Sequence, residues 1–147
     1  MSLRQKITMA TNMKNSQKQD MIIIDDEKAL RLLLKEFFKD KFNVTTLQTG
    51  HGCMDHMYTN PVPKVAIIDL GLPDVSGLEL ITRLRKESKW DDMVIVVLSS
   101  REASTDRIAA LRAGADDYLQ KPFNPEELEV RIGAILRRIE RHAAVPA

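Results

Sequence analysis

The sequence predicts an α/β protein built on a doubly wound, five-stranded parallel sheet with five helices. Short apolar segments alternate with amphipathic segments five times, and no repeat or low-complexity tract interrupts the pattern. The segment at 21–24 is apolar throughout, as expected of a strand buried on both faces of a parallel sheet. Parallel strands need crossover connections, and amphipathic helices of this length supply them. The alternation therefore indicates a sheet with helices on both faces.

The five expected strands are short and mostly aliphatic. The segment at 93–98 carries the strongest strand signal, because it is rich in β-branched residues that pack well on a pleated surface. The segment at 44–47 carries the weakest. In chain order, the expected strands cover residues 21–24, 44–47, 65–68, 93–98 and 117–119.

The five expected helices lie between and after these strands. The first has an apolar stripe that includes Leu30, Leu33 and Leu34 at helical spacing. The second is the least certain from its sequence, since glycines near its start disfavour a helix. In chain order, the expected helices cover residues 27–39, 51–58, 78–86, 104–113 and 125–141.

Cap residues indicate where two of these helices end and begin. Gly114 follows the fourth helix, at the position where a left-handed residue commonly closes a helix. Asn124 precedes the fifth helix as its N-cap, with Pro125 in the first turn and Glu127 three residues after the cap. This spacing predicts a capping box, in which each side chain accepts from the other residue's backbone N–H.

Composition and charge favour one globular domain in the cytoplasm. The 147 residues carry a net charge of +1, so no overall field argues for a nucleic acid partner. A single cysteine, Cys53, excludes an intramolecular disulfide and fits a reducing compartment. No apolar run approaches the length of a membrane span, so no membrane partner is expected.

The domain itself is expected to cover residues 20–142. Residues 1–19 show no sustained apolar period and are expected to be a flexible tail, whose opening Met-Ser-Leu could be left from an expression vector. A functional basic arm is the alternative for this tail, which carries Arg4, Lys6, Lys14 and Lys18. Residues 143–147 are expected to be a C-terminal tail or the start of a linker.

Polar residues that could perform chemistry follow four of the expected strands. Asp25 and Asp26 follow the first, Asp69 the third, Ser99 the fourth, and Lys121 the fifth after one intervening residue. Each alone is an ordinary turn or cap residue. Because sites in open α/β sheets lie at the carboxyl ends of the strands, we expect all five side chains to meet at one edge.

Three clustered carboxylates would repel one another unless a cation lay between them. Mg²⁺ fits such a set, because it takes one or two carboxylates and keeps waters and a phosphate oxygen as further ligands; Mn²⁺ is the alternative. A carboxylate can also attack a phosphoryl group to give an acyl phosphate. The sequence thus favours phosphoryl transfer to Asp69, with Ser99 and Lys121 contacting the transferred group.

These motifs resemble those of receiver domains from bacterial two-component response regulators. The resemblance extends from about residue 20 to residue 141. It rests on four segments in the family's order and spacing: IIIDDE, AIIDLGLPDVSGLEL, VIVVLSSRE and AGADDYLQKPF. It implies the flavodoxin-like topology, and a signalling switch that catalyses only its own phosphorylation and dephosphorylation.

The resemblance also implies roles for the acidic residues and their neighbours. Asp69 is similar to the phosphoacceptor of the family and also to one of its metal ligands. Asp26 resembles a direct metal ligand, and Asp25 an acid that holds a metal-bound water. Gly71 would offer its backbone carbonyl to the metal, and Ser99 stands at the family's switch hydroxyl.

The last segment of the resemblance implies three further roles. Lys121 resembles the lysine that pairs with the phosphate, and Pro122 would follow a cis peptide bond. Tyr118 matches an aromatic position that, in the family, swings inward when the hydroxyl residue moves toward the phosphate. The chain departs modestly from the family at Gly71 and Arg101, which stand where side chains tune the lifetime of the phosphate.

The expected partner is a sensor histidine kinase or a phosphotransfer protein. A homodimer could form through the helix at 104–113, the strand at 117–119 and one face of the helix at 125–141, as in regulators that carry a DNA-binding domain. The arginines of that last helix could equally be a solvated helix end. DNA would be contacted only through another domain, because no recognition helix is present in this pattern.

Three other hypotheses compete with this one. A zinc site at His51, Cys53 and His56 offers only three ligands where closed structural sites take four, so Cys53 more plausibly packs against the sheet. A magnesium-dependent phosphohydrolase would use Asp69 as well, but Gly71 stands where a second acid is needed. A degenerate receiver that only binds would lack a site residue, and none is missing.

Overall fold

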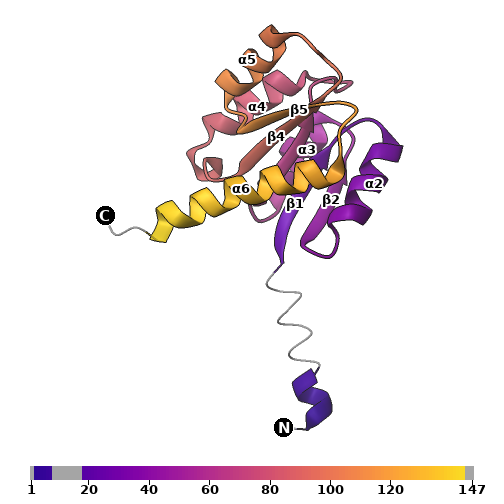
Figure 1. Ribbon diagram of the computed structural model, residues 1–147, viewed down its shortest axis with the longest axis vertical. Helices are drawn as coiled ribbons and strands as arrows, with labels where there is room; N and C mark the ends of the chain where they lie inside the picture. Colours follow the sequence, from indigo (N-terminus) through magenta and orange to yellow (C-terminus); the bar gives the residue numbers. More distant parts are fainter. Residues whose placement is uncertain (1, 8–17, 145–147) are drawn as a thin grey trace.

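A computed structural model describes residues 2–7 and 18–144 of the chain. Residues 3–7 are helical, whereas the flexibility predicted for residues 1–19 stays a prediction, since most of that segment lies outside the described residues. Five parallel strands form one sheet in the order β2-β1-β3-β4-β5, which is the predicted doubly wound fold (Figure 1). The strands are β1 (Gln19–Ile24), β2 (Phe42–Leu47), β3 (Val65–Asp69), β4 (Val94–Ser99) and β5 (Asp117–Gln120).

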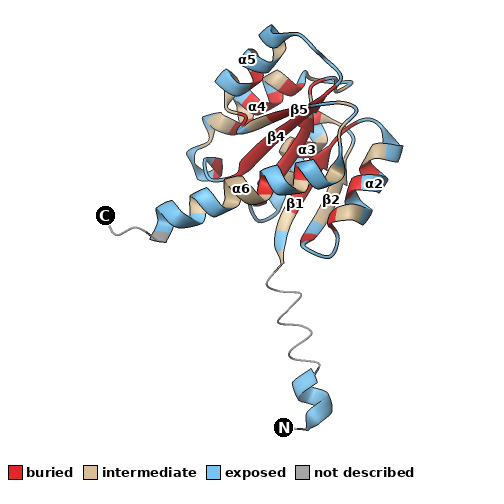
Figure 2. Cartoon of the chain, in the orientation of Figure 1, coloured by how far each residue is buried: buried red, intermediate tan, exposed pale blue. Residues whose placement is uncertain are grey.

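Helices cover both faces of the sheet, and the strands are largely buried between them (Figure 2). One face packs against α2 (Lys28–Phe38) and α6 (Pro125–Ala144). The other packs against α3 (Gly50–Thr59), α4 (Gly77–Lys86) and α5 (Ser104–Ala113). The sequence did not predict the short 3-10 segment η1 (Ser88–Trp90), which precedes β4. Across the described ranges, no helix is long and apolar enough to cross a bilayer.

The boundaries of several elements differ from the predicted ones by one to three residues. β1 begins at Gln19, one residue before the predicted start of the domain. Its polar first residues, Gln19 and Asp20, pair with β2 just as the apolar residues after them do. α6 continues to Ala144, beyond the predicted domain end at residue 142. The predicted tail therefore keeps only residues 145–147, which lie outside the described part.

The apolar stripe of α2 was predicted wrongly at one position. Leu33 is 51% exposed, whereas Arg31, Leu34 and Phe38 are the buried residues of the helix. The guanidinium of Arg31 donates to the backbone carbonyl of Asp25 at 2.7 Å, so the buried group has a hydrogen-bond partner. The helix therefore turns Arg31 toward the sheet and Leu33 toward solvent.

The start of α6 also differs from the predicted capping box. The Asn124 side chain accepts from the N–H of Glu126 at 2.9 Å, not from that of Glu127. The carboxylate of Glu127 accepts from Arg131 instead, one helical turn further on. The ends of α5 are as predicted, with Gly114 at φ +122° closing the helix.

Arg85, at the end of α4, joins three elements through its guanidinium group. It donates to the backbone carbonyls of Gly114 at 3.0 Å and Met93 at 2.8 Å, and pairs with the Asp116 carboxylate at 3.1 Å. A side chain on Gly114 would collide with Arg85, since a Cβ there would lie 2.5 Å from its Cγ. The C-terminal end of α5 is therefore held against α4 and the start of β4.

Candidate functional site

The predicted site residues meet at the carboxyl edge of the sheet. Asp25 follows β1, Asp69 ends β3, Ser99 ends β4 and Lys121 follows β5. The strands β1, β3, β4 and β5 are consecutive in the sheet, so their carboxyl ends lie side by side along one edge. Sequence order alone separates Asp25 from Lys121 by 96 positions, yet their side chains touch.

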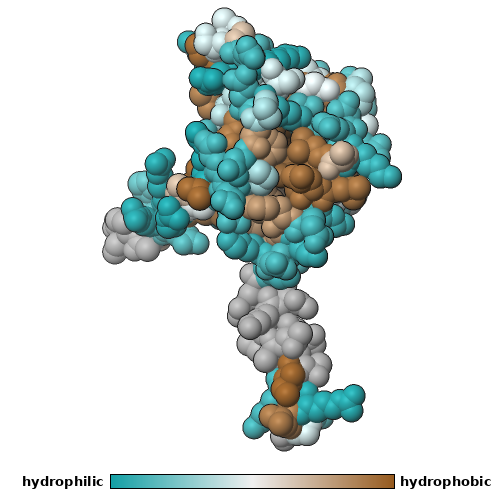
Figure 3. Space-filling view, turned by 45° about the vertical axis from the view of Figure 1, so that its right-hand side comes forward, coloured by the Kyte–Doolittle hydropathy of each residue, from teal (hydrophilic) through white to brown (hydrophobic). Residues whose placement is uncertain are grey.

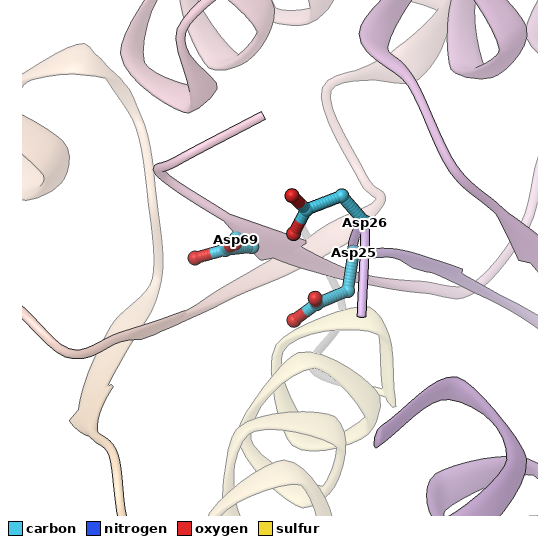
Figure 4. A group of neighbouring side chains, drawn as sticks. All are labelled: Asp25, Asp26 and Asp69. Atoms are coloured by element: carbon cyan, nitrogen blue, oxygen red, sulfur yellow. The ribbon is translucent and has the colours of Figure 1, made fainter. Parts of the chain in front are cut away.

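Asp25, Asp26 and Asp69 form one acidic cluster (Figure 4). One carboxylate oxygen of each residue lies within 4.8 Å of the others. Asp25 is buried at 2% exposure, Asp69 is half-buried and Asp26 is exposed, so the cluster opens to solvent on one side. An open set of hard oxygen donors fits Mg²⁺ or Mn²⁺, because these ions keep water or a phosphate oxygen among their ligands.

Lys121 supplies the positive charge beside this cluster. Its Nζ donates to Asp25 Oδ2 at 2.8 Å and lies 3.7 Å from Asp69 Oδ1. Burial lowers the pKa of Lys121, but the hydrogen bond and charge of Asp25 outweigh burial, so the pKa lies above its usual value. The ammonium group therefore stays charged at neutral pH, within reach of the Asp69 carboxylate.

Asp69 experiences opposing influences from its surroundings. Burial raises the pKa of its carboxyl group above the usual value, and the charges of Asp25 and Asp26 add to this effect. Lys121 and the backbone N–H of Gly71 act in the opposite direction. The ionised carboxylate is thus disfavoured first by burial and then by its acidic neighbours, and a divalent cation between the three acids would offset their repulsion.

Ser99 is buried and has a hydroxyl proton available. Its Oγ accepts from the backbone N–H of Arg101 at 3.1 Å, and its carbonyl accepts from the N–H of Lys121 at 2.7 Å. A hydroxyl that accepts one hydrogen bond can still donate its own proton. Next to Lys121, the peptide bond that precedes Pro122 is cis, as the resemblance implies.

Tyr118 occupies the inward position of its predicted switch. The ring is 7% exposed and packs within the core on the α3, α4 and α5 side of the sheet. Its hydroxyl donates to the backbone carbonyl of Arg101 at 3.0 Å, and the Arg107 guanidinium lies 5.7 Å from the ring centroid. The sequence did not identify these two arginine contacts, since neither has a spacing signal.

The alternative zinc ligands do not come together. Cys53 is fully buried on the inner side of α3, and burial raises the pKa of its thiol to about 12. The imidazole of His51 faces Asp74 at 2.9 Å, and that of His56 faces Asn60 at 3.3 Å. The prediction that Cys53 packs against the sheet is confirmed.

Comparisons with known proteins agree with this site. A sequence model described as the response regulator receiver domain matches residues 21–133. The KDP operon transcriptional regulatory protein KdpE of Escherichia coli (strain K12) is 41% identical over 132 residues, which are 87% of this chain and 54% of the relative. Response regulator MprA of Mycobacterium ulcerans (strain Agy99) is 38% identical over 80% of this chain and 50% of the relative. The chain spans about half the length of the curated relatives it matches.

Solved structures of receiver domains are also similar to this chain. The receiver domain of the Francisella response regulator 1452 has a TM-score of 0.75 at 28% identity, covering 83% of this chain and 99% of that one. The BeF3-activated DrrB receiver domain has a TM-score of 0.73 at 28% identity, covering 82% and 98%. With the family's sequence pattern over residues 21–133 and its fold around the acidic edge, the chain belongs to the response regulator receiver domain family of two-component signalling.

Proposed function

We propose that this domain, acting in the cytoplasm, takes a phosphoryl group onto Asp69 from a phosphohistidine of a sensor histidine kinase or phosphotransfer protein. The observation that carries the proposal is the pairing of the acidic cluster with Lys121, which lies 3.7 Å from Asp69. Three acids and a lysine at one half-open edge suit a dianionic phosphoryl group and a divalent cation together. The domain is a signalling switch rather than an enzyme with turnover on outside substrates.

The reaction is an in-line displacement on phosphorus. An Asp69 carboxylate oxygen forms the new O–P bond, while the N–P bond to the donor imidazole breaks and the imidazole takes up a proton. Asp25, Asp26, Asp69 and the Gly71 carbonyl would hold Mg²⁺ or Mn²⁺, and the ion would supply positive charge to the phosphoryl oxygens. Lys121 offsets the remaining negative charge.

Ser99 and Tyr118 convert the new phosphate into a change of shape. The Ser99 hydroxyl has a proton to donate to a phosphate oxygen, and Arg101, whose N–H it accepts from, also binds the Tyr118 hydroxyl through its carbonyl. A displacement of Ser99 toward the phosphate would therefore act on Tyr118 through Arg101, which is hydrogen-bonded to both. In this proposal, phosphate stabilises the inward ring position that the structure already contains.

The donor protein has an apolar surface available beside the site. A cavity of about 310 Å³ lies next to Lys121 and is lined by Leu30, Leu33 and Phe123 among others. Figure 3 shows apolar side chains gathered on this side of the molecule, around α2 and α6. A partner helix that packs there would stand close enough to present a phosphohistidine to Asp69.

Labelling with acetyl phosphate tests the proposed function. With Mg²⁺, the wild-type domain should take up one phosphoryl group, and a chelator should prevent this, because the carboxylates otherwise repel the incoming dianion. Intact-mass spectrometry measures the label. A lack of labelling in Mg²⁺ would overturn the proposal. Steady multi-turnover hydrolysis of a small phosphate ester would favour the phosphohydrolase instead.

We also propose that the domain forms a homodimer through the face formed by α5, β5 and α6, and that this dimerisation controls a DNA-binding output domain. Arg107, Asp117, Tyr118 and Arg131 line one groove of about 460 Å³ on this face, and α5 exposes Ile108 beside it. A face that carries both charges can pair with a second copy of itself across a twofold axis. The groove also includes the switch tyrosine, so phosphorylation can alter the face.

Ile108→Glu should weaken this dimer. In the presence of beryllofluoride and Mg²⁺, sedimentation velocity should show a dimer for the wild type, and a dissociation constant raised about tenfold or more for the variant. Leu32→Glu is the matched control, because Leu32 is similarly exposed but lies on α2. Equal association of Ile108→Glu and wild type, or equal loss in both variants, would contradict this interface.

A further inference from the structure

The loop after the phosphoacceptor is attached to the start of α3 by one side chain. Asp74 Oδ1 accepts from the N–H of Gly50 at 2.9 Å, and Oδ2 accepts from the N–H of His51 at 2.8 Å. The imidazole Nδ1 of His51 lies 2.9 Å from the same Oδ2. Only 18% of the Asp74 side chain is exposed, although it belongs to a surface loop. Both carboxylate oxygens are therefore committed to another element.

The helix α3 does not need Asp74 as its N-cap. Thr49 already fills that role, since its hydroxyl accepts from the N–H of Gly52 at 2.9 Å. Gly50 permits the close approach of the loop, because a Cβ there would lie 2.2 Å from Val75 Cγ2. Desolvation raises the pKa of Asp74, but hydrogen bonds from His51 and Gly50 lower it to about 2, so the group is ionised at neutral pH. These contacts satisfy two first-turn donors of α3 that Thr49 leaves free, and they also attach the loop to the helix.

The other end of the same loop is attached to Leu70, the residue that follows β3. The N–H of Gly77 donates to the Leu70 carbonyl at 2.9 Å. A Cβ on Gly77 would lie 2.5 Å from the Asp69 carbonyl oxygen, so the chain passes directly against the acceptor's backbone. Gly71 lies in the chain between Leu70, which accepts from Gly77, and Asp74, which binds the start of α3. A Cβ on Gly71 would lie 3.7 Å from Asp69 Oδ2, so the start of the loop lies beside the acceptor carboxylate.

We propose that Asp74 is a positioning residue for phosphorylation: it anchors the acceptor loop to α3 and thereby keeps Gly71 in place for the cation and for Asp69. The inference rests on the proposed function, because it assigns a role in that reaction. Asp74 touches neither reacting atoms nor cation; it acts through the backbone of residues 71–73. His51 contributes a third contact to the same anchor.

Paired variants at the same helix start can separate this role from ordinary stability. Asp74→Ala removes the anchor, whereas Thr49→Ala removes the N-cap of the same helix without touching the loop. Melting temperatures and Mg²⁺ titration followed by the Gly71 amide NMR signal should be measured for both. We expect Asp74→Ala to weaken Mg²⁺ binding about tenfold. Thr49→Ala should keep the wild-type affinity within about twofold, even at an equal loss of melting temperature.

Two milder variants keep the proposal testable if Asp74→Ala does not fold. Asp74→Asn keeps one accepting oxygen and should recover part of the lost Mg²⁺ affinity, and His51→Ala should have a smaller effect than Asp74→Ala. Wild-type Mg²⁺ affinity in both Asp74 variants would overturn the inference. So would equal weakening in Thr49→Ala. A wild-type domain that acetyl phosphate does not label would instead overturn the proposed function itself.

Discussion

Asp69→Asn should abolish labelling by acetyl phosphate in the presence of Mg²⁺. The side-chain amide has almost the shape of the carboxylate, but it is not a comparable nucleophile and cannot form a stable acyl phosphate. The neighbouring acids Asp25 and Asp26 follow β1, whereas Asp69 ends β3, so neither has the position of Asp69 at the edge of the sheet. Intact-mass spectrometry should show no phosphorylated species at times when the wild type is fully labelled.

The same substitution should leave the fold intact and change its pH dependence. Burial raises the pKa of Asp69 in the folded state, so the wild type has its full share of stability from this group below the usual pKa of an aspartate and loses it as the pH rises through the elevated value. Asp69→Asn cannot ionise and should not show this loss. Its free energy of unfolding at neutral pH, from urea titration, should equal or exceed that of the wild type.

Asp92→Asn is the control, because Asp92 is an exposed acid that precedes β4 at the opposite edge of the sheet. It should be labelled like the wild type. If Asp69→Asn took up label to the wild-type extent, the assignment of the acceptor would be wrong.

Lys121→Ala should separate phosphoryl transfer from cation binding. Nζ donates to Asp25 Oδ2 at 2.8 Å, so the ammonium group competes with a cation for that oxygen. Its removal leaves the cluster more negative, and Mg²⁺ should bind at least as tightly as in the wild type. Transfer to Asp69 should nevertheless become about 10²-fold slower, because the positive charge that offsets the phosphoryl oxygens is lost.

The two readouts are the Mg²⁺ affinity from calorimetric titration and the initial rate of labelling at saturating Mg²⁺. Lys41→Ala is the matched control, since Lys41 is exposed and pairs with Glu129 away from the site. A parallel fall of affinity and rate in Lys121→Ala would mean that Lys121 only holds the carboxylates in place.

The sequence predicts this fold well because burial on both faces of a parallel sheet leaves a continuous apolar signal. All five strands and the five helices α2–α6 lie where alternation indicates them, and Asp25, Asp69 and Lys121 are predicted from their positions at or just after the ends of strands. Position at the end of a strand is a local property of the sequence. The parallel arrangement then converts that local property into proximity at one edge.

The features that the sequence missed depend on contacts between distant segments. Arg31 takes an interior position because the Asp25 carbonyl is there to accept its hydrogen bond, and helical spacing alone favoured Leu33. The anchor from Asp74 to α3 joins residues 23 and 24 positions apart, and no spacing pattern in the sequence links them. The inward position of Tyr118 likewise depends on a carbonyl in another loop.

The contacts of Arg85 hold one end of α5 in place, the C-terminal end. At its C-terminal end, the Gly114 carbonyl is held by Arg85. At its N-terminal end, Ala103 provides no side-chain cap, and Ala110 is the helix's buried residue. The segment that leads into this end of the helix comes directly from Ser99. Movement that starts at Ser99 should therefore swing the first turns of α5 about a pivot at Gly114, and the displacement should grow along the helix toward the end nearest the phosphate.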